Sequence, residues 1–122
     1  MIECSKLHLE LLPGDGHHHL LKKDFRLHFK GVWYFVPKGF VTDGASIPPY
    51  LRWICGDPNK SPRNIPALLH DYGYLIGGSE SKRKEIDTLY RDLSIAFGIP
   101  KWKSNIEYLA LRLCGRSHWK QK

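Results

Sequence analysis

The spacing of apolar residues changes once along this chain, near Pro48-Pro49, and this change constrains the fold more than any other feature. Before it, apolar and polar residues alternate in stretches such as residues 6–12 and 25–29, with the period of a half-buried strand. After it, apolar residues recur every three or four positions, as they do on one face of a helix. Strands followed by helices predict an α+β fold: an N-terminal antiparallel hairpin or meander, then three helices packed as a small single domain.

The strand half contains one well-marked hairpin. Residues 25–29 alternate, Lys30-Gly31 can turn, and residues 32–36 are rich in β-branched and aromatic side chains. We therefore expect residues 1–41 to be mainly β. Residues 42–62 are expected to form a structured loop that includes a short helix.

The first two helices of the second half have recognisable ends. One is expected to begin near Ile65, with Asn64 as its cap, and to stop at the glycine pair at positions 77 and 78. The next is expected over residues 82–97, with Ser81 as its cap and apolar residues at three- and four-residue intervals.

The third helix is expected to begin after Pro100 and to end at Gly115. The helical part then covers residues 63–115, a basic tail follows over residues 116–122, and the whole chain forms one domain. One face of this helix is expected to be its apolar, packing face. The residues of that face are Trp102, Ile106, Leu109, Ala110 and Leu113.

The composition limits the class of protein. With 122 residues, of which 42% are hydrophobic, the chain fits one compact domain with a modest core. Its 19 basic and 12 acidic residues give a net charge of +7, so phosphates, acidic lipid headgroups and acidic protein surfaces are reasonable partners. The basic residues of the helices, among them Arg83 and Arg112, are expected to form a solvated face, and no helix-turn-helix or zinc-finger spacing indicates specific reading of nucleic acid.

The cysteines and the amino terminus bear on localisation. Cys4, Cys55 and Cys114 are odd in number and widely separated, which argues against a disulfide scaffold and against a thiolate zinc site. No apolar run approaches the ~18–20 residues that span a bilayer, and the amino terminus does not resemble a signal peptide. We expect a soluble, unprocessed protein in a reducing compartment.

The residues that could carry chemistry lie around the first helix. His70 and Tyr74 are one turn apart and share a face, and the glycine pair after them can bring Asp87 of the next helix close to His70. A carboxylate at one imidazole nitrogen fixes the tautomer, so that the other nitrogen can accept a proton from water or a hydroxyl. His70, Asp87 and Tyr74 are therefore the candidate catalytic residues, although Tyr74 can equally fill the helix pair with its ring.

A cation is the second element of this hypothesis. Asp71 is rotated by roughly 100° from His70 on the same helix and can therefore aim at a different target. With Asp43 from the loop as a second oxygen ligand, it could hold Ca²⁺ or another divalent cation that polarises a carbonyl or phosphoryl oxygen.

Two resemblances follow from these motifs. The string Val36-Pro-x-Gly-Phe-Val-Thr-Asp-Gly-Ala-Ser-Ile-Pro48, then His70-Asp-Tyr-Gly-Tyr74, then Asp87, resembles a family of small phage and prophage proteins of unknown function. The likeness runs from about Phe25 to about Gly115. It implies a phage-encoded protein located in the virion or in the host cytoplasm.

The second resemblance is confined to two helices. His70-Asp71-x-x-Tyr74 followed by Asp87 is similar to the His-Asp helix and partnering Asp of phospholipases A2. That similarity implies that His70 deprotonates the attacking water and that Asp71 binds calcium. It also implies that Asp87 orients His70 and bonds to Tyr74. The Tyr-Gly-x-Gly calcium loop of phospholipases A2 is absent, so residues 42–46 would have to replace it.

Two classes of function are therefore consistent with the sequence. One is a small metal-assisted hydrolase of an ester, phosphoester or lipid. The other is a non-catalytic phage component of the virion, tail or host contact, in which the same residues form a buried polar network. Its partners would be other phage structural proteins or host factors, with anionic lipid or nucleic acid as less specific contacts. The exposure of His70 distinguishes the two classes, because a base needs a solvent-reachable pocket.

Overall fold

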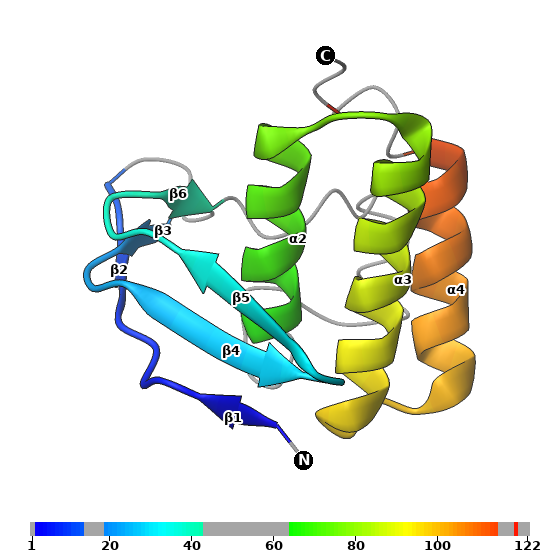
Figure 1. Cartoon of the computed structure of the whole chain (residues 1–122), viewed down its shortest axis with the longest axis horizontal. Helices are drawn as coiled ribbons and strands as arrows, with labels where there is room; N and C mark the ends of the chain where they lie inside the picture. The colour runs from blue at the N-terminus through cyan, green and yellow to red at the C-terminus, as the bar shows by residue number, and fades with distance from the viewer. Residues whose placement is uncertain (1, 14–18, 43–63, 115–118, 120–122) are drawn as a thin grey trace. The chain divides into compact units, whose positions relative to one another are not determined.

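The computed structural model describes residues 2–13, 19–42, 64–114 and 119. Six strands precede three helices, which confirms the predicted α+β fold class (Figure 1). The strands are β1 (Glu3–Cys4), β2 (Leu9–Leu11), β3 (His19–Leu21), β4 (Phe25–Phe29), β5 (Val32–Val36) and β6 (Val41–Thr42). The helices are α2 (Asn64–Ile76), α3 (Glu80–Ala96) and α4 (Lys101–Cys114).

The chain divides into two compact units, residues 1–43 and residues 44–122. The strands belong to the first unit and the helices to the second. The prediction that the whole chain forms one domain stays a prediction. The short helix expected within the loop of residues 42–62 and the basic tail, apart from Trp119, lie outside the described residues.

The β unit contains two three-stranded sheets, ordered β1-β4-β5 and β2-β3-β6, and every described strand pair is antiparallel. The hairpin of β4 and β5 runs in register from the pair Phe25 and Val36 to the pair Phe29 and Val32. Lys30 and Gly31 both have positive φ, at 49° and 77°, as a two-residue turn between twisted strands requires. The hairpin prediction is confirmed.

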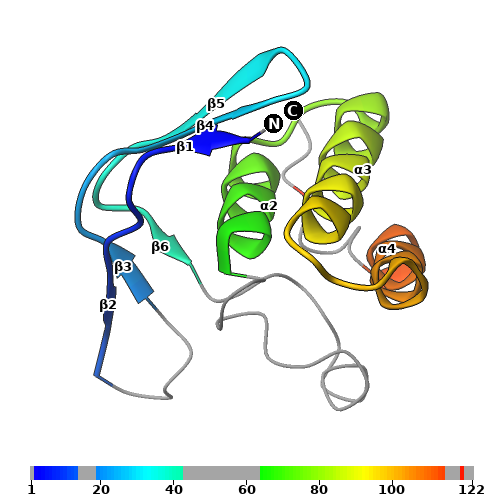
Figure 2. The same ribbon diagram turned by 90° about the horizontal axis from the view of Figure 1, so that it is seen from below.

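The helical unit has α3 in the middle, with α2 and α4 as its neighbours (Figure 2). Ala67, Tyr90 and Leu111, one from each helix, form a buried apolar cluster. Gly73 on α2 lies directly against Ile86 on α3, where an added Cβ would meet the isoleucine side chain at 2.8 Å. The missing side chain therefore allows the close approach of these two helices.

The end of α2 agrees with the sequence, and the start of α3 differs. Helix α2 begins at Asn64, whose side chain accepts a hydrogen bond from the Ile65 amide, and it ends before Gly77, whose φ is 71°. The cap of α3 is Ser79 rather than Ser81: its hydroxyl accepts from the Lys82 amide at 3.3 Å. The prediction of Ser81 was wrong because the connection after α2 is shorter than expected, so α3 starts at Glu80.

The outward face of α4 also differs from the prediction. The stripe expected to pack inward is largely exposed: Trp102 by 57%, Leu109 by 58% and Leu113 by 82%. The helix instead buries Ser104, Glu107, Ala110 and Leu111, of which only Ala110 was expected. Within the described ranges, no helix is long and apolar enough to cross a membrane.

Candidate functional site

Helix α2 supplies the first two residues of the site. His70 and Tyr74 are 1% and 4% exposed, and their rings lie 4.2 Å apart between centroids. Residues four positions apart share a helix face, so both side chains point in the same direction from α2.

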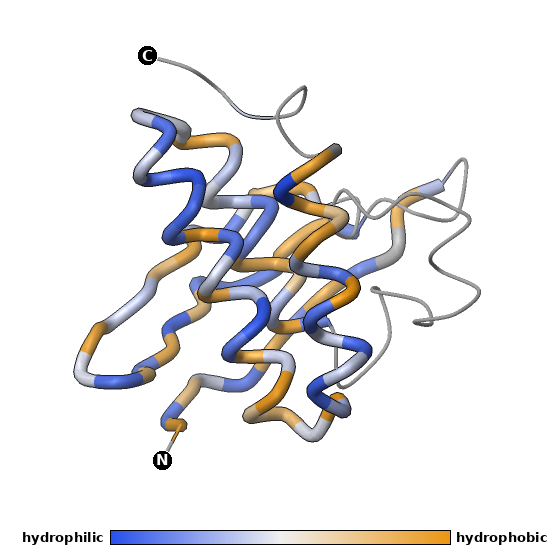
Figure 3. Tube along the Cα trace, turned by 90° about the vertical axis from the view of Figure 1, so that its right-hand side faces the viewer, coloured by the Kyte–Doolittle hydropathy of each residue, from blue (hydrophilic) through white to orange (hydrophobic). Residues whose placement is uncertain are grey.

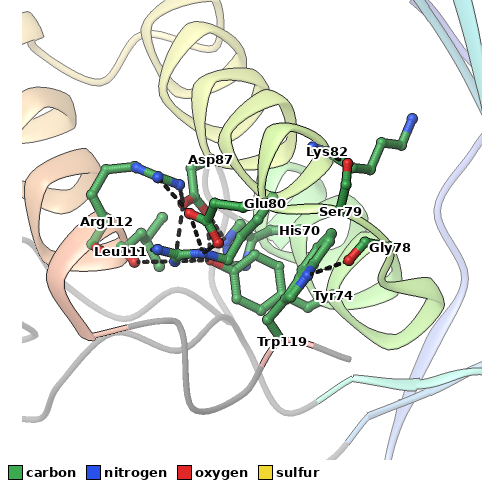
Figure 4. A network of polar contacts seen from close by, with 11 residues as sticks. His70, Tyr74, Gly78, Ser79, Glu80, Lys82, Asp87, Leu111, Arg112 and Trp119 are labelled. Carbon is green, nitrogen blue, oxygen red and sulfur yellow. Dashed lines mark hydrogen bonds and ion pairs between the residues drawn. The ribbon is translucent and has the colours of Figure 1, made fainter. Parts of the chain in front are cut away.

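Asp87 of α3 meets both of these side chains. Its Oδ1 lies 3.0 Å from Nε2 of His70 and accepts the Tyr74 hydroxyl at 2.6 Å (Figure 4). The side chains of His70 and Asp87 have no exposed surface. The structure thus brings together the three residues that the sequence predicted as catalytic.

Two arginines complete the surroundings of Asp87. Nη1 of Arg112, from α4, donates to Oδ2 of Asp87 at 2.9 Å, and Nη1 of Arg83 lies 3.5 Å from the same oxygen. Arg83 also donates to the Tyr74 hydroxyl at 3.2 Å and is only 3% exposed. The expectation that Arg83 and Arg112 belong to a solvated face was wrong, because each has a buried carboxylate to pair with.

Arg83 also binds the end of α4. Its guanidinium donates to the carbonyl oxygens of Leu111 and Arg112 at 3.0 and 3.1 Å. Carbonyls in the last turn of a helix have no partner within that helix, and a cation there also opposes the negative end of the helix dipole. Arg83 therefore joins all three helices through Tyr74, its own position on α3, and the α4 terminus.

Glu80 links the two arginines at the edge of the site. It accepts from Nε of Arg83 at 3.1 Å and from Nη2 of Arg112 at 2.8 Å, and its side chain is half exposed. We call this set the Asp87 network. Its members are His70, Tyr74, Glu80, Arg83, Asp87 and Arg112.

A sequence signal for the missed residues existed. Glu80, Arg83 and Asp87 are spaced by three and then four residues, so they share one face of α3 and alternate in charge. Arg112 had no such signal, because its pairing depends on where α4 lies. Trp119 was also missed: it is 8% exposed, donates Nε1–H to the Gly78 carbonyl at 3.0 Å and meets the Tyr74 ring edge-on.

Electrostatics fix the protonation state of the centre. Burial opposes ionisation of Asp87, but the hydrogen bonds from His70 and Tyr74 and the one from Arg112 outweigh it and lower the pKa of this carboxyl. An ionised carboxylate only accepts hydrogen bonds, so Nε2 of His70 carries the hydrogen between them. Burial, and then the hydrogen bond to Asp87, raise the pKa of Tyr74, which keeps its hydroxyl neutral as a donor.

The arginines and Glu80 are held ionised as well. Burial disfavours the charge on Arg83 and Arg112, but hydrogen bonds to Glu80 and to other acceptors in the network raise the pKa of both. Hydrogen bonds from the same two arginines lower the pKa of Glu80. The network therefore holds two guanidinium groups against two carboxylates.

Of the two predicted cation ligands, Asp71 lies among the described residues and Asp43 does not. Asp71 is half-buried on α2. Among the side chains that the structure describes, no three His, Cys, Asp or Glu residues are grouped as a metal site. The cation stays a prediction.

A second buried polar contact lies next to the network. The Tyr90 hydroxyl donates to Oε1 of Glu107 at 2.9 Å, and Glu107 has no exposed surface. The Tyr90 ring packs edge-on against His70 at 5.4 Å between centroids. The inner faces of α3 and α4 thus combine polar and apolar contacts.

Comparison with known proteins gives a family match and one curated relative. A family model described as Protein of unknown function (DUF1353) matches residues 20–111. The uncharacterized protein y4iH of Sinorhizobium fredii (strain NBRC 101917 / NGR234) is 33% identical over 105 residues. That alignment covers 85% of this chain and 43% of the relative, so the chain spans less than half of the relative's length. No solved structure matches the chain significantly.

Proposed function

This chain belongs to the family described as Protein of unknown function (DUF1353), and we propose that it is a non-catalytic phage component, of the virion, tail or host contact, whose helices are held rigid by the Asp87 network. The observation that supports this choice is the complete burial of the His70 and Asp87 side chains. A general base has to reach water or substrate, whereas a structural residue does not. The phage assignment follows from the resemblance of the sequence motifs to small phage and prophage proteins.

The occupancy of Asp87 supports the same choice. Oδ1 receives His70 and Tyr74, and Oδ2 receives Arg112, with Arg83 nearby. Two guanidinium groups beside the carboxylate reduce the negative potential that would make His70 more basic. Both oxygens of Asp87 thus have donors, from α2 and from α4, and such contacts fix the positions of the helices that contribute to them.

The proposal is tested by unfolding the His70→Ala variant in urea and by assaying it beside the wild type. We expect the substitution to remove one of the buried hydrogen-bond donors of Asp87, at a cost of roughly 1–3 kcal/mol. We also expect the wild type to turn over neither a soluble ester nor phospholipid, with or without calcium. His28→Ala is the control: His28 is a half-buried strand residue in the β unit and should change the stability of the helical unit little. Turnover that disappears in His70→Ala, at unchanged stability, would refute the proposal.

A metal-assisted hydrolase is the second candidate, and one observation favours it. Asp87 bonds to Nε2 of His70, so Nδ1 is the nitrogen that a general base would use, and Tyr74 bonds to the same carboxylate. This is the base and orienter arrangement that the phospholipase A2 resemblance implies. In this candidate Asp71 and Asp43 hold Ca²⁺ or another divalent cation.

Calorimetric titration with calcium tests this second candidate. The hydrolase requires calcium uptake by the wild type, loss of uptake in Asp71→Asn, and ester or phospholipid turnover that depends on both Asp71 and His70. Uptake without turnover would leave a cation-binding protein and remove the hydrolase. No uptake and no turnover would leave the structural role.

A further inference from the structure

Helix α4 presents an apolar stripe that nothing in the described structure covers. Trp102, Ile106, Leu109 and Leu113 are spaced by four, three and four residues, so their side chains share one side of the helix. Trp102, Leu109 and Leu113 are each more than half exposed. Figure 3 shows apolar positions recurring along the helical traces. We call these four residues the α4 stripe.

The exposed charges of α4 itself are positive. Lys101 and Lys103 lie on opposite sides of the α4 stripe, at roughly 100° from its centre by helix geometry. Nζ of Lys103 lies 5.5 Å from the centroid of the Trp102 ring. Glu107 is the one acidic residue in the α4 sequence, and it has no exposed surface. The exposed side of α4 therefore offers lysines and apolar groups without a carboxylate.

A second copy of the chain does not match this surface. An aromatic side chain buries about 150–250 Å² when fully covered, so three partly exposed side chains fall well short of the roughly 800 Å² per partner of a stable interface. Two copies of α4 would also bring together helices that have exposed lysines and no exposed carboxylate to pair with them. The partner should therefore be both apolar and negatively charged.

We propose that the α4 stripe binds an anionic lipid surface, with α4 lying in the plane of the interface. A helix with aromatic and leucine residues on one side and lysines beside them places its apolar side at the boundary of headgroups and acyl chains. Lysines flanking that side extend their ammonium groups to the lipid phosphates, and the Trp ring occupies the headgroup level. This inference goes beyond the proposed function and does not rest on it, because it concerns another face of the helical unit.

Co-sedimentation of the full chain with lipid vesicles tests the proposal. One set of vesicles is phosphatidylcholine alone, and the other contains equal parts of phosphatidylcholine and phosphatidylglycerol. We expect binding to the mixed vesicles and weakening by added salt, because the lysine contribution is screened. The Leu109→Ser, Leu113→Ser double variant should lose most of this binding. The Lys101→Gln, Lys103→Gln variant should bind the mixed vesicles roughly thirtyfold more weakly, at about 1 kcal/mol per lysine.

Two control variants distinguish lipid binding by the α4 stripe from nonspecific binding by any exposed apolar side chain. Leu75→Ser removes a leucine that is 51% exposed on α2, and Trp33→Ser removes a tryptophan that is 62% exposed on β5. Both variants should bind mixed vesicles as the wild type does. Because Leu109 and Leu113 are mostly exposed, their replacement should lower the unfolding midpoint only slightly, and urea unfolding of the same samples checks this.

Three outcomes would overturn the proposal. The first is absence of binding to the mixed vesicles. The second is equal binding by the wild type and the Leu109→Ser, Leu113→Ser variant. The third is a dimer in light scattering that this double variant abolishes, which would assign the α4 stripe to a second copy of the chain.

Discussion

Asp87 is the residue on which the arrangement of the three helices depends most. It receives His70 and Tyr74 from α2 and Arg112 from α4, while its own backbone belongs to α3. Removing one partner from a buried ion pair leaves an uncompensated charge, which costs far more than an exposed pair contributes.

Asp87→Asn should therefore lower the free energy of unfolding at neutral pH by roughly 3–5 kcal/mol. The folded-state pKa of Asp87 is lowered, so its contribution is fully present above its ordinary pKa of about 3.9 and is lost as the pH falls through the lowered value. The gap between wild type and variant should narrow in acid, as measured by urea unfolding from pH 7 to pH 3. Asp92→Asn, in an adjacent and partly exposed pair with Arg91, is the control and should cost less than about 1 kcal/mol. A gap that is constant with pH would contradict this assignment.

At the residue scale the sequence predicted half of the Asp87 network, namely His70, Tyr74 and Asp87. The spacing of His70 and Tyr74 on one helix and the tight connection to Asp87 were enough to predict their meeting. The spacing of Glu80, Arg83 and Asp87 carried a signal for Arg83, but Arg112 could not be predicted, because an exposed arginine and a buried one look alike in a basic sequence. What distinguishes Arg112 is the carboxylate that the packing of α4 places beside it.

At the scale of elements, the start of α3 can be tested directly. Ser79→Ala should destabilise the helical unit by about 0.5–2 kcal/mol, because it removes the acceptor for the Lys82 amide. Ser81→Ala should change the stability by much less, since Ser81 is an exposed helical residue and alanine favours the helix. Urea unfolding of both variants makes the comparison. An equal loss in both would contradict the cap at Ser79.

The contact of α2 with α3 gives a second element-scale prediction. Gly73→Ala should destabilise the wild type, because the new Cβ would lie 2.8–3.1 Å from three side-chain carbons of Ile86. In an Ile86→Ala background the clash is gone, and the same change should stabilise by about 1 kcal/mol through helix propensity. A double-mutant cycle in urea measures both values. If Gly73→Ala changed the free energy of unfolding in the same direction in both backgrounds, the contact with Ile86 would not explain the glycine at position 73.

The elements also show where periodicity succeeds and fails. The β4–β5 hairpin was predicted because a two-residue turn between alternating strands is encoded locally. The orientation of α4 was not, because periodicity finds an apolar face without saying what covers it. A partly polar face of α4 turns inward because Glu107 bonds to Tyr90 and the end of α4 accepts from Arg83. These contacts join residues far apart in the sequence, so local periodicity does not encode them.

At the scale of the whole molecule, the change of pattern near Pro48-Pro49 lies close to the boundary between the two compact units after residue 43. The sequence therefore predicted the order of strands and helices and the approximate point at which strands give way to helices. The α+β class follows from these patterns alone. The cation at Asp43 and Asp71 stays a prediction, because residue 43 lies outside the described residues.

The central claim is that His70 is a buried structural partner of Asp87, and NMR of its imidazole ring tests this most directly. In uniformly ¹⁵N-labelled protein at neutral pH, we predict that Nε2 carries the proton and that this proton exchanges slowly with water. The reason is that the hydrogen is donated to a carboxylate without exposed surface. An Nε2 proton that exchanges rapidly with water, or a ring protonated mainly on Nδ1, would contradict the account.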